Sequence, residues 1–232
     1  SRNLRVVQSH SSTMSDKYLL GRFPDDGRDK AIALREKVQR FVCRLVSEGR
    51  RVLIVTTKTY RQYLTTDQHP DDEKIEYQPN RSEDWEGATI THFGIFKGSN
   101  EWTDCDTVVI IGRNQPPPNA IDDQLRALYC DAFKPLILAG DEGYIFECRA
   151  YRMRDGTNRA VWVDVHPDAR GQQLLAMARE CETVQAVDRI RPIHARKTKD
   201  AFLLCDMPVD LTVDEINILD GILRTPGREG EK

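Results

Sequence analysis

Residues 91–113, THFGIFKGSNEWTDCDTVVIIGR, carry the pattern that decides the fold. The apolar run 107–111 is rich in valine and isoleucine and ends at Gly112, which Asn114 and three prolines follow. Short β-branched runs bounded by glycine and proline predict a buried strand rather than a helix. The glycines before the run predict a turn in which bare backbone can approach a bound group.

The segments upstream extend this pattern into a layered fold. Residues 29–48 have the apolar spacing of an amphipathic helix, and residues 52–55 form an apolar run of strand length. A second helix is expected to begin over 60–64, and a strand is expected over 88–93. Strands that alternate with helices predict an α/β fold, in which a parallel sheet is flanked by crossover helices.

The pattern changes after the prolines. A helix is expected over 120–133, and residues 135–165 then alternate like antiparallel strands with a hairpin turn at 155–158. A helix over 172–187 and a strand over 201–205 return to the α/β pattern. We interpret the antiparallel part as a β insertion in an α/β domain.

The two ends of the chain complete the predicted organisation. An edge strand is expected over 4–7, and a closing helix over 211–223, with Thr212 and Glu215 at capping-box spacing. The predicted parts are an N-terminal extended segment (1–28), an α/β domain (29–224) with its β insertion at about 135–166, and a flexible tail (225–232).

The composition is that of a globular chain without a global attraction for polyanions. The 232 residues carry a formal net charge of −3, so a nucleic-acid site requires a local basic patch. The six cysteines form no CxxC pair, which fits reduced cytoplasmic thiols rather than a zinc site or a disulfide framework. No apolar stretch reaches the roughly 18 residues of a membrane span. We expect a cytoplasmic protein with no membrane partner and, since the chain starts at Ser1 without methionine, a piece of something longer.

A first candidate site lies where the helix over 172–187 ends. Gln185 and Arg189 are four residues apart and share a helical face, and Arg191 follows just before Pro192. Arginine forks match phosphate oxygens, and an arginine supplied across a cleft can stabilise the charge of phosphoryl transfer. The alternative is a solvated helix end, where cations are favoured in any case.

A second candidate is the loop that precedes the strand at 107–111. Gly98 and Asn100 could help to present backbone N–H groups to an anion, and Lys97 adds positive charge. The alternative is a tight turn with a lysine on the surface.

Two further segments are candidates for contact with nucleic acid. Thr56, Thr57 and Lys58 follow a buried strand and suit sequence-independent phosphate contacts, with strand-end capping as the alternative. Arg152 and Arg154 belong to a basic cluster on the predicted hairpin, where the alternative is a contribution to solubility alone.

Taken in this order, the segments resemble the second RecA-like domain of superfamily-2 helicases and translocases. Residues 93–116 resemble motif V of the chromatin-remodelling branch and of phage or plasmid replication helicases, in which a Gly-x-Asn loop precedes an acidic, aliphatic strand. Residues 185–191 resemble motif VI, and 51–58 resemble the motif IV strand. The resemblance spans 31–207. It departs at Asp188, where motif VI usually has glycine, and at the β insertion between motifs V and VI.

The resemblance implies roles for individual residues. Gln185 and Arg189 would face a nucleotide across a cleft, with Arg189 as the arginine finger and Arg191 as a second phosphate or coupling contact. Gly98 and Asn100 would shape motif V, which links the nucleotide to the nucleic-acid track, and would belong to the nucleotide-binding residues with Gln185. Thr56, Thr57 and Lys97 would lie near the nucleic-acid backbone.

The sequence contains no GxxxxGKS or GxxxxGKT phosphate loop and no DExx-type metal-binding strand, which this family carries in its first RecA-like domain. We therefore expect the second motor domain of an ATP-dependent DNA helicase or translocase, slow or inactive in ATP hydrolysis alone. ATP and Mg²⁺ would be held mainly by an N-terminal RecA-like domain of the same protein, and RNA could replace DNA. The alternatives are a non-catalytic nucleic-acid-binding or scaffold protein with this fold, and an unrelated parallel α/β enzyme.

Overall fold

The computed structural model describes residues 3–11, 13–72, 81–95 and 100–224. Its strands are β1 (Leu4–Ser9), β2 (Val52–Thr56), β3 (Glu83–Trp85), β4 (Ala88–His92), β5 (Thr107–Ile111), β6 (Ile145–Met153), β7 (Asn158–Val165), β8 (Lys199–Leu204), β9 (Thr212–Val213) and β10 (Glu215–Asn217). Its helices are α1 (Asp16–Leu19), α2 (Gly27–Ser47), α3 (Lys58–Thr66), α4 (Pro118–Leu128), α5 (Ala169–Ala178), α6 (Glu180–Asp188) and α7 (Leu219–Arg224), with short 3-10 turns η1 (Gly140–Glu142) and η2 (Pro192–His194).

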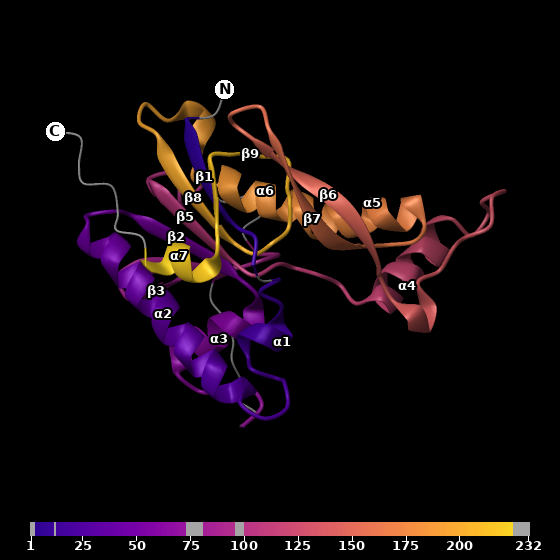
Figure 1. Cartoon of the computed structure of the whole chain (residues 1–232), viewed down its shortest axis with the longest axis horizontal. Helices are drawn as coiled ribbons and strands as arrows, with labels where there is room; N and C mark the ends of the chain where they lie inside the picture. The colour runs from indigo at the N-terminus through magenta and orange to yellow at the C-terminus, as the bar shows by residue number, and fades with distance from the viewer. Residues whose placement is uncertain (1–2, 12, 73–80, 96–99, 225–232) are drawn as a thin grey trace.

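The described strands form one large sheet and one small sheet (Figure 1). The large sheet has seven strands in the order β10-β1-β8-β5-β2-β4-β3, and the small sheet has the order β7-β6-β9. Every pairing in the large sheet is parallel except that of β3 with β4. The fold is therefore α/β with a mostly parallel sheet.

Hydrophobic cores cover both faces of the large sheet. One core includes side chains of α2, α3 and α7, and the other includes side chains of α6 and of the small sheet. Within β5, Val109 and Ile111 enter the first core, whereas Val108 and Ile110 enter the second. Successive residues of a strand point to opposite faces, so a strand covered on both sides is apolar throughout. This explains the continuous apolar run that ends at Gly112.

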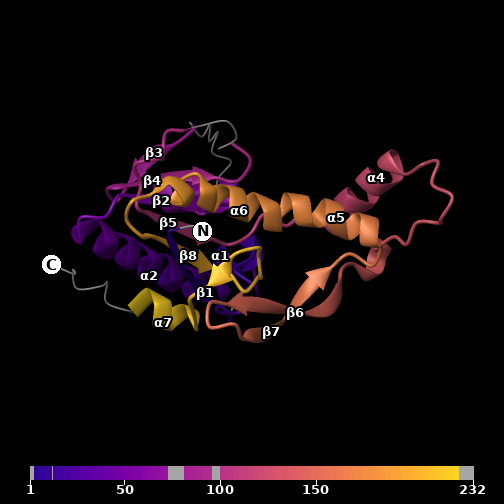
Figure 2. The same ribbon diagram turned by 90° about the horizontal axis from the view of Figure 1, so that it is seen from above.

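The prolines after β5 lead into a lobe that extends beyond the large sheet (Figure 2). This lobe, residues 118–178, contains α4, η1, the β6–β7 hairpin and α5. β6 pairs antiparallel with β7 along most of its length and parallel with β9 at Arg152 and Met153. The predicted β insertion is therefore present as a hairpin, although residues 135–138 are irregular instead of forming a strand.

Three predicted elements differ from the structure for reasons that involve distant parts of the chain. The strand predicted at the edge of the sheet is β1, which pairs with both β8 and β10, so the N-terminal segment is internal to the sheet. The helix predicted over 211–223 is wrong, because β9 pairs with β6 and β10 pairs with β1 before the short α7 begins. The helix predicted over 172–187 is divided into α5 and α6, because Arg179 leaves helical geometry with φ −115° and ψ −71°.

Two glycines with the same backbone geometry test the close packing at the end of β5. Gly112 has φ +78°, and a Cβ there would lie 2.6 Å from the Met14 carbonyl oxygen, whereas Gly49 has φ +79° and nothing within 4 Å. We expect Gly49→Ala to cost about 1–2 kcal/mol of unfolding free energy for the left-handed backbone. Gly112→Ala should cost roughly 1–3 kcal/mol more because the Met14 backbone must move. Urea unfolding of both variants measures the difference, and equal losses would contradict the close contact.

Candidate functional site

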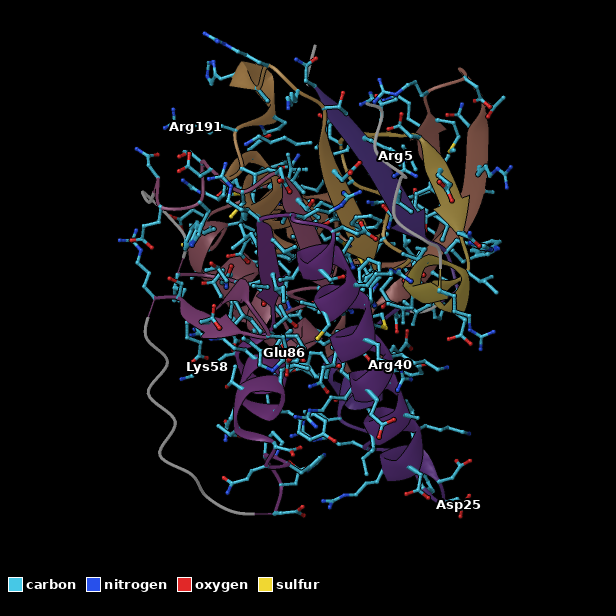
Figure 3. All side chains as sticks on the ribbon, turned by 90° about the vertical axis from the view of Figure 1, so that its left-hand side faces the viewer. Arg5, Asp25, Arg40, Lys58, Glu86 and Arg191 are labelled. Carbon is cyan, nitrogen blue, oxygen red and sulfur yellow. The ribbon has the colours of Figure 1, made fainter. Side chains whose placement is uncertain are left out.

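The parallel strands give the large sheet two chemically distinct edges. The amino ends of β1, β2, β5 and β8 lie at one edge, here called the amino edge, and their carboxyl ends lie at the opposite, carboxyl edge. Arg191 immediately precedes η2, which leads to the first residue of β8, whereas Lys58 follows the last residues of β2. Figure 3 accordingly shows Arg191 and Lys58 well separated along the direction of the strands. The predicted site residues are therefore divided between the two edges.

A cavity of about 310 Å³ lies at the amino edge, between the turn before β5 and the turn that joins α6 to β8. This amino-edge cavity is lined by Asn100, Gln185, Asp188, Arg189, Arg191, Pro192, Ile193 and His194. Arg191 Nη2 donates a hydrogen bond of 2.7 Å to Asn100 Oδ1, joining residues 91 positions apart in the chain. The structure thus brings together Gln185, Arg189 and Arg191 with Asn100, from two separate sequence candidates.

The backbone at the end of α6 differs from what the motif pattern suggested. Asp188, which stands where glycine was expected, is the last residue of α6 and needs no glycine conformation. The left-handed conformation occurs instead at Arg191, with φ 51° and ψ 57°. The N–H of Arg191 donates to the Asp188 carbonyl at 3.0 Å, and the N–H of His194 donates to the Arg191 carbonyl at 3.2 Å. Left-handed non-glycine residues are uncommon and are concentrated at functional sites.

A larger cavity, of about 630 Å³, lies at the carboxyl ends of β2, β4 and β5. This carboxyl-edge cavity is lined by residues 15–17, 57–59, 92–93 and 113–118 and by Tyr144. Lys17 and Lys58 bring positive charge to it, and Asp16 brings negative charge. Two buried nitrogen atoms of lining residues, His92 Nε2 and Arg113 Nε, have no hydrogen-bond partner among the described residues. Open α/β sheets commonly bind ligands at this edge.

The His92 ring presents an acceptor in this cavity. Its Nδ1 lies 2.7 Å from the Phe93 carbonyl oxygen, so Nδ1 carries the proton and donates it. Burial is the main cause that lowers the pKa of His92, with smaller contributions from Arg61 and Lys58. The imidazole is therefore neutral at pH 7, and its Nε2 is a buried acceptor without a partner among the described residues.

Thr56, the last residue of β2, and Thr57, which follows it, are already engaged within the protein. Thr56 is fully buried, and its hydroxyl donates to the Ile111 carbonyl at 2.8 Å. The Thr57 hydroxyl caps α3 by accepting from the Tyr60 N–H at 3.3 Å, and it also bonds to Asp16. The expected nucleic-acid contact of Thr56 does not fit this burial, whereas Lys58 is exposed at the first position of α3. Lys97 and Gly98 lie outside the described residues.

The hairpin arginines are paired with aspartates. Arg152 Nη2 lies 2.7 Å from Asp210 Oδ1. Arg154 bonds to the Asp214 carboxylate and, at 3.0 Å, to the Leu4 carbonyl, and Asp214 also accepts from the Val6 N–H at 2.8 Å. Arg154 therefore ties the hairpin to β1. The charge expected to attract nucleic acid is balanced locally at both arginines.

A buried polar network, which the sequence did not reveal, fixes the chain where it leaves β5. Arg113 Nη2 donates to Asp164 at 2.7 Å, and Gln115 Nε2 donates to the same carboxylate at 3.0 Å. Arg179 is fully buried between α5 and α6 and donates to Gln115 Oε1 at 3.0 Å and to Glu180 at 2.7 Å. The partners come from distant segments, so no local pattern could have identified them.

Within residues 3–11, 13–72, 81–95 and 100–224, no group of three His, Cys, Asp or Glu side chains could hold a metal ion. In the same part of the chain, no helix is long and apolar enough to cross a membrane.

No protein-family profile, curated protein or solved structure matches the chain.

Arg179 tests whether the buried network holds the wall of the carboxyl-edge cavity. Arg179→Met should cost about 3–5 kcal/mol, because it removes the buried partner of the Glu180 carboxylate and the donor to Gln115. The largely buried carboxylate then keeps only its longer contact of 3.4 Å with Arg149. Arg126→Met, at an exposed ion pair with Asp123, should cost no more than about 0.5 kcal/mol. Chemical denaturation measures both, and a loss for Arg179→Met as small as that for Arg126→Met would contradict the role of the network.

Proposed function

We propose that this chain is the second RecA-like motor domain of an ATP-dependent superfamily-2 helicase or translocase that acts on DNA. The observation that carries the proposal is the hydrogen bond between Arg191 and Asn100. It joins the segment that resembles motif VI to the segment that resembles motif V, in one cavity with Gln185 and Arg189. The mostly parallel sheet with helices on its faces is consistent with a RecA-like domain.

The amino-edge cavity supplies the groups that such a domain contributes to a shared nucleotide site. Arg189 and Arg191 provide guanidinium groups on one short turn, and Gln185 lies one helical turn before Arg189. Guanidinium groups from a second domain neutralise the charge that develops on the transferred phosphoryl group. ATP and Mg²⁺ would be held mainly by the phosphate loop of a first RecA-like domain of the same protein.

The carboxyl-edge cavity offers a separate place for the nucleic acid. Lys58 is exposed at the start of α3, and Lys17 lines the same cavity. A helix N-terminus and lysine side chains suit phosphate oxygens. β2 and β5 connect this edge to the amino edge, so one rigid sheet links the two sites. The roles of Lys97 near the nucleic acid and of Gly98 in motif V stay predictions of the resemblance, because both residues lie outside the described ones.

A second candidate function is a non-catalytic binding or scaffold protein. Large apolar side chains are exposed on the lobe, including Phe133, Phe146 and Trp162. Exposed apolar groups gathered on one projection are typical of a surface that binds another protein. A scaffold would use this lobe and would not require the arginines of the amino-edge cavity.

Arg189 separates the two candidate functions. In the protein that carries both motor domains, Arg189→Ala should lower the rate of ATP turnover by about 10³-fold or more and leave nucleotide affinity largely unchanged. Arg196→Ala is the matched control, because Arg196 is exposed in the same loop and does not line the cavity. Turnover by Arg189→Ala equal to that of Arg196→Ala would overturn the motor assignment and favour the scaffold.

Lys58 tests the nucleic-acid site. Lys58→Ala should weaken DNA binding at all sequences alike and reduce the slope of log affinity against log salt by about 1, as expected for one lost phosphate contact. Lys197→Ala, an exposed lysine near the opposite edge, should leave affinity and slope unchanged. Fluorescence anisotropy with single-stranded DNA at several salt concentrations gives both values. An unchanged slope for Lys58→Ala would remove this edge from the DNA track.

A further inference from the structure

Lys199, the first residue of β8, holds together the two turns that form the amino-edge cavity. Its ammonium group donates three hydrogen bonds, to the carbonyl oxygens of Thr103 at 2.8 Å, Cys105 at 2.7 Å and Ile190 at 2.6 Å. Thr103 and Cys105 belong to the turn before β5, and Ile190 belongs to the turn after α6. All three N–H groups of the ammonium therefore bond to backbone, and they bond to both turns.

Backbone hydrogen bonds within residues 100–106 and 189–195 connect neighbouring residues in each of the two turns to which Lys199 donates. In the turn before β5, the Cys105 N–H donates to the Trp102 carbonyl at 3.1 Å, and the Thr103 N–H donates to the Asn100 carbonyl at 3.5 Å. In the other turn, Ile190 stands between Arg189 and Arg191 in the chain. Lys199 is thereby connected through a few bonds to both partners of the Arg191–Asn100 hydrogen bond.

Lys199 itself does not line the amino-edge cavity. Any effect it has on a ligand there must act through Asn100 and the arginines. Hydrogen bonds from a charged donor are stronger than neutral ones, and carbonyl groups that lose such a donor are left poorly satisfied. A lysine placed in this way can set the separation of two turns without touching what they bind.

We propose that Lys199 is a positioning residue that fixes the turn carrying Asn100 against the turn carrying Arg189 and Arg191. That the two turns then bind the phosphate chain of a nucleotide rests on the proposed function. The joining of the two turns by Lys199 does not. The preformed arrangement spares the two turns the loss of conformational freedom that binding would otherwise require.

The test compares Lys199→Met with Lys197→Met in the full chain. Methionine keeps an unbranched side chain of similar length and removes the three donors, and Lys197 is an exposed lysine two residues earlier. Amide hydrogen exchange in residues 100–106 and 189–195 should become about 10-fold faster or more in Lys199→Met, with β2 and β4 unaffected. Lys197→Met should exchange like the unmodified chain. Unchanged exchange in either turn of Lys199→Met would overturn the positioning role.

A second measurement needs no substitution. In the unmodified chain labelled with ¹⁵N-lysine, an ammonium group with three hydrogen bonds should give an N–H signal that persists at neutral pH, and Lys199→Arg identifies it by its loss. A Lys199 signal absent under conditions where the amide spectrum shows a folded chain would overturn the proposal even if Lys199→Met fails to fold.

Titration with inorganic tripolyphosphate separates the positioning role from the proposed function. The unmodified chain should show shifts of the Arg189 and Arg191 Nε signals, and Lys199→Met should bind about 10-fold more weakly at a temperature where its amide spectrum shows a folded chain. Absence of tripolyphosphate binding by the unmodified chain would count against the amino-edge cavity as a phosphate site, whereas equal affinity of the two proteins would overturn the role of Lys199 in positioning the arginines.

Discussion

The pairing of β5 between β2 and β8 is the constraint on which the rest of the structure depends. β8 and β2 hold β5 on its two sides, and its residues are buried on both faces of the sheet. Because β5 and β8 are parallel neighbours, the turns that precede them must lie side by side. Asn100 and Arg191 meet for this reason, although 91 residues separate them. The amino-edge cavity is thus a product of the topology.

The same topology separates two kinds of chemistry. The amino edge presents arginines and an asparagine on short turns, and the carboxyl edge presents lysines, a neutral imidazole and a helix N-terminus around a larger cavity. A motor domain needs its nucleotide and its track at different places on one rigid body. A sheet whose middle strands are buried on both faces can transmit a displacement from one edge to the other, because a packed core deforms little.

Much of the large sheet could be predicted, because its signals are local. The run that became β5, the apolar spacing of α2 and the strand before Lys58 depend on residues within one element. The hydrogen bond between Asn100 and Arg191 was not predicted, because it joins two segments whose spacing in the sequence says nothing of their contact.

What the sequence could not predict depends on partners far along the chain. β9 and β10 are strands because β6 and β1 offer them pairing, which overrides the helical spacing of their residues. The burial of Arg179, its bond to Gln115 and the pairing of Arg154 with Asp214 likewise require the folded chain. The strand that ends at Thr56 is clear from the sequence, yet only the structure shows that the Thr56 hydroxyl donates to the Ile111 carbonyl.

The most direct measurement is a structure of the two-domain protein with a non-hydrolysable ATP analogue. The account predicts that the guanidinium of Arg189 or Arg191 lies at charge-assisted hydrogen-bond distance, about 2.7–2.9 Å, from an oxygen of the γ-phosphate. A nucleotide bound wholly within the first domain or in the carboxyl-edge cavity, with both arginines facing solvent, would contradict it.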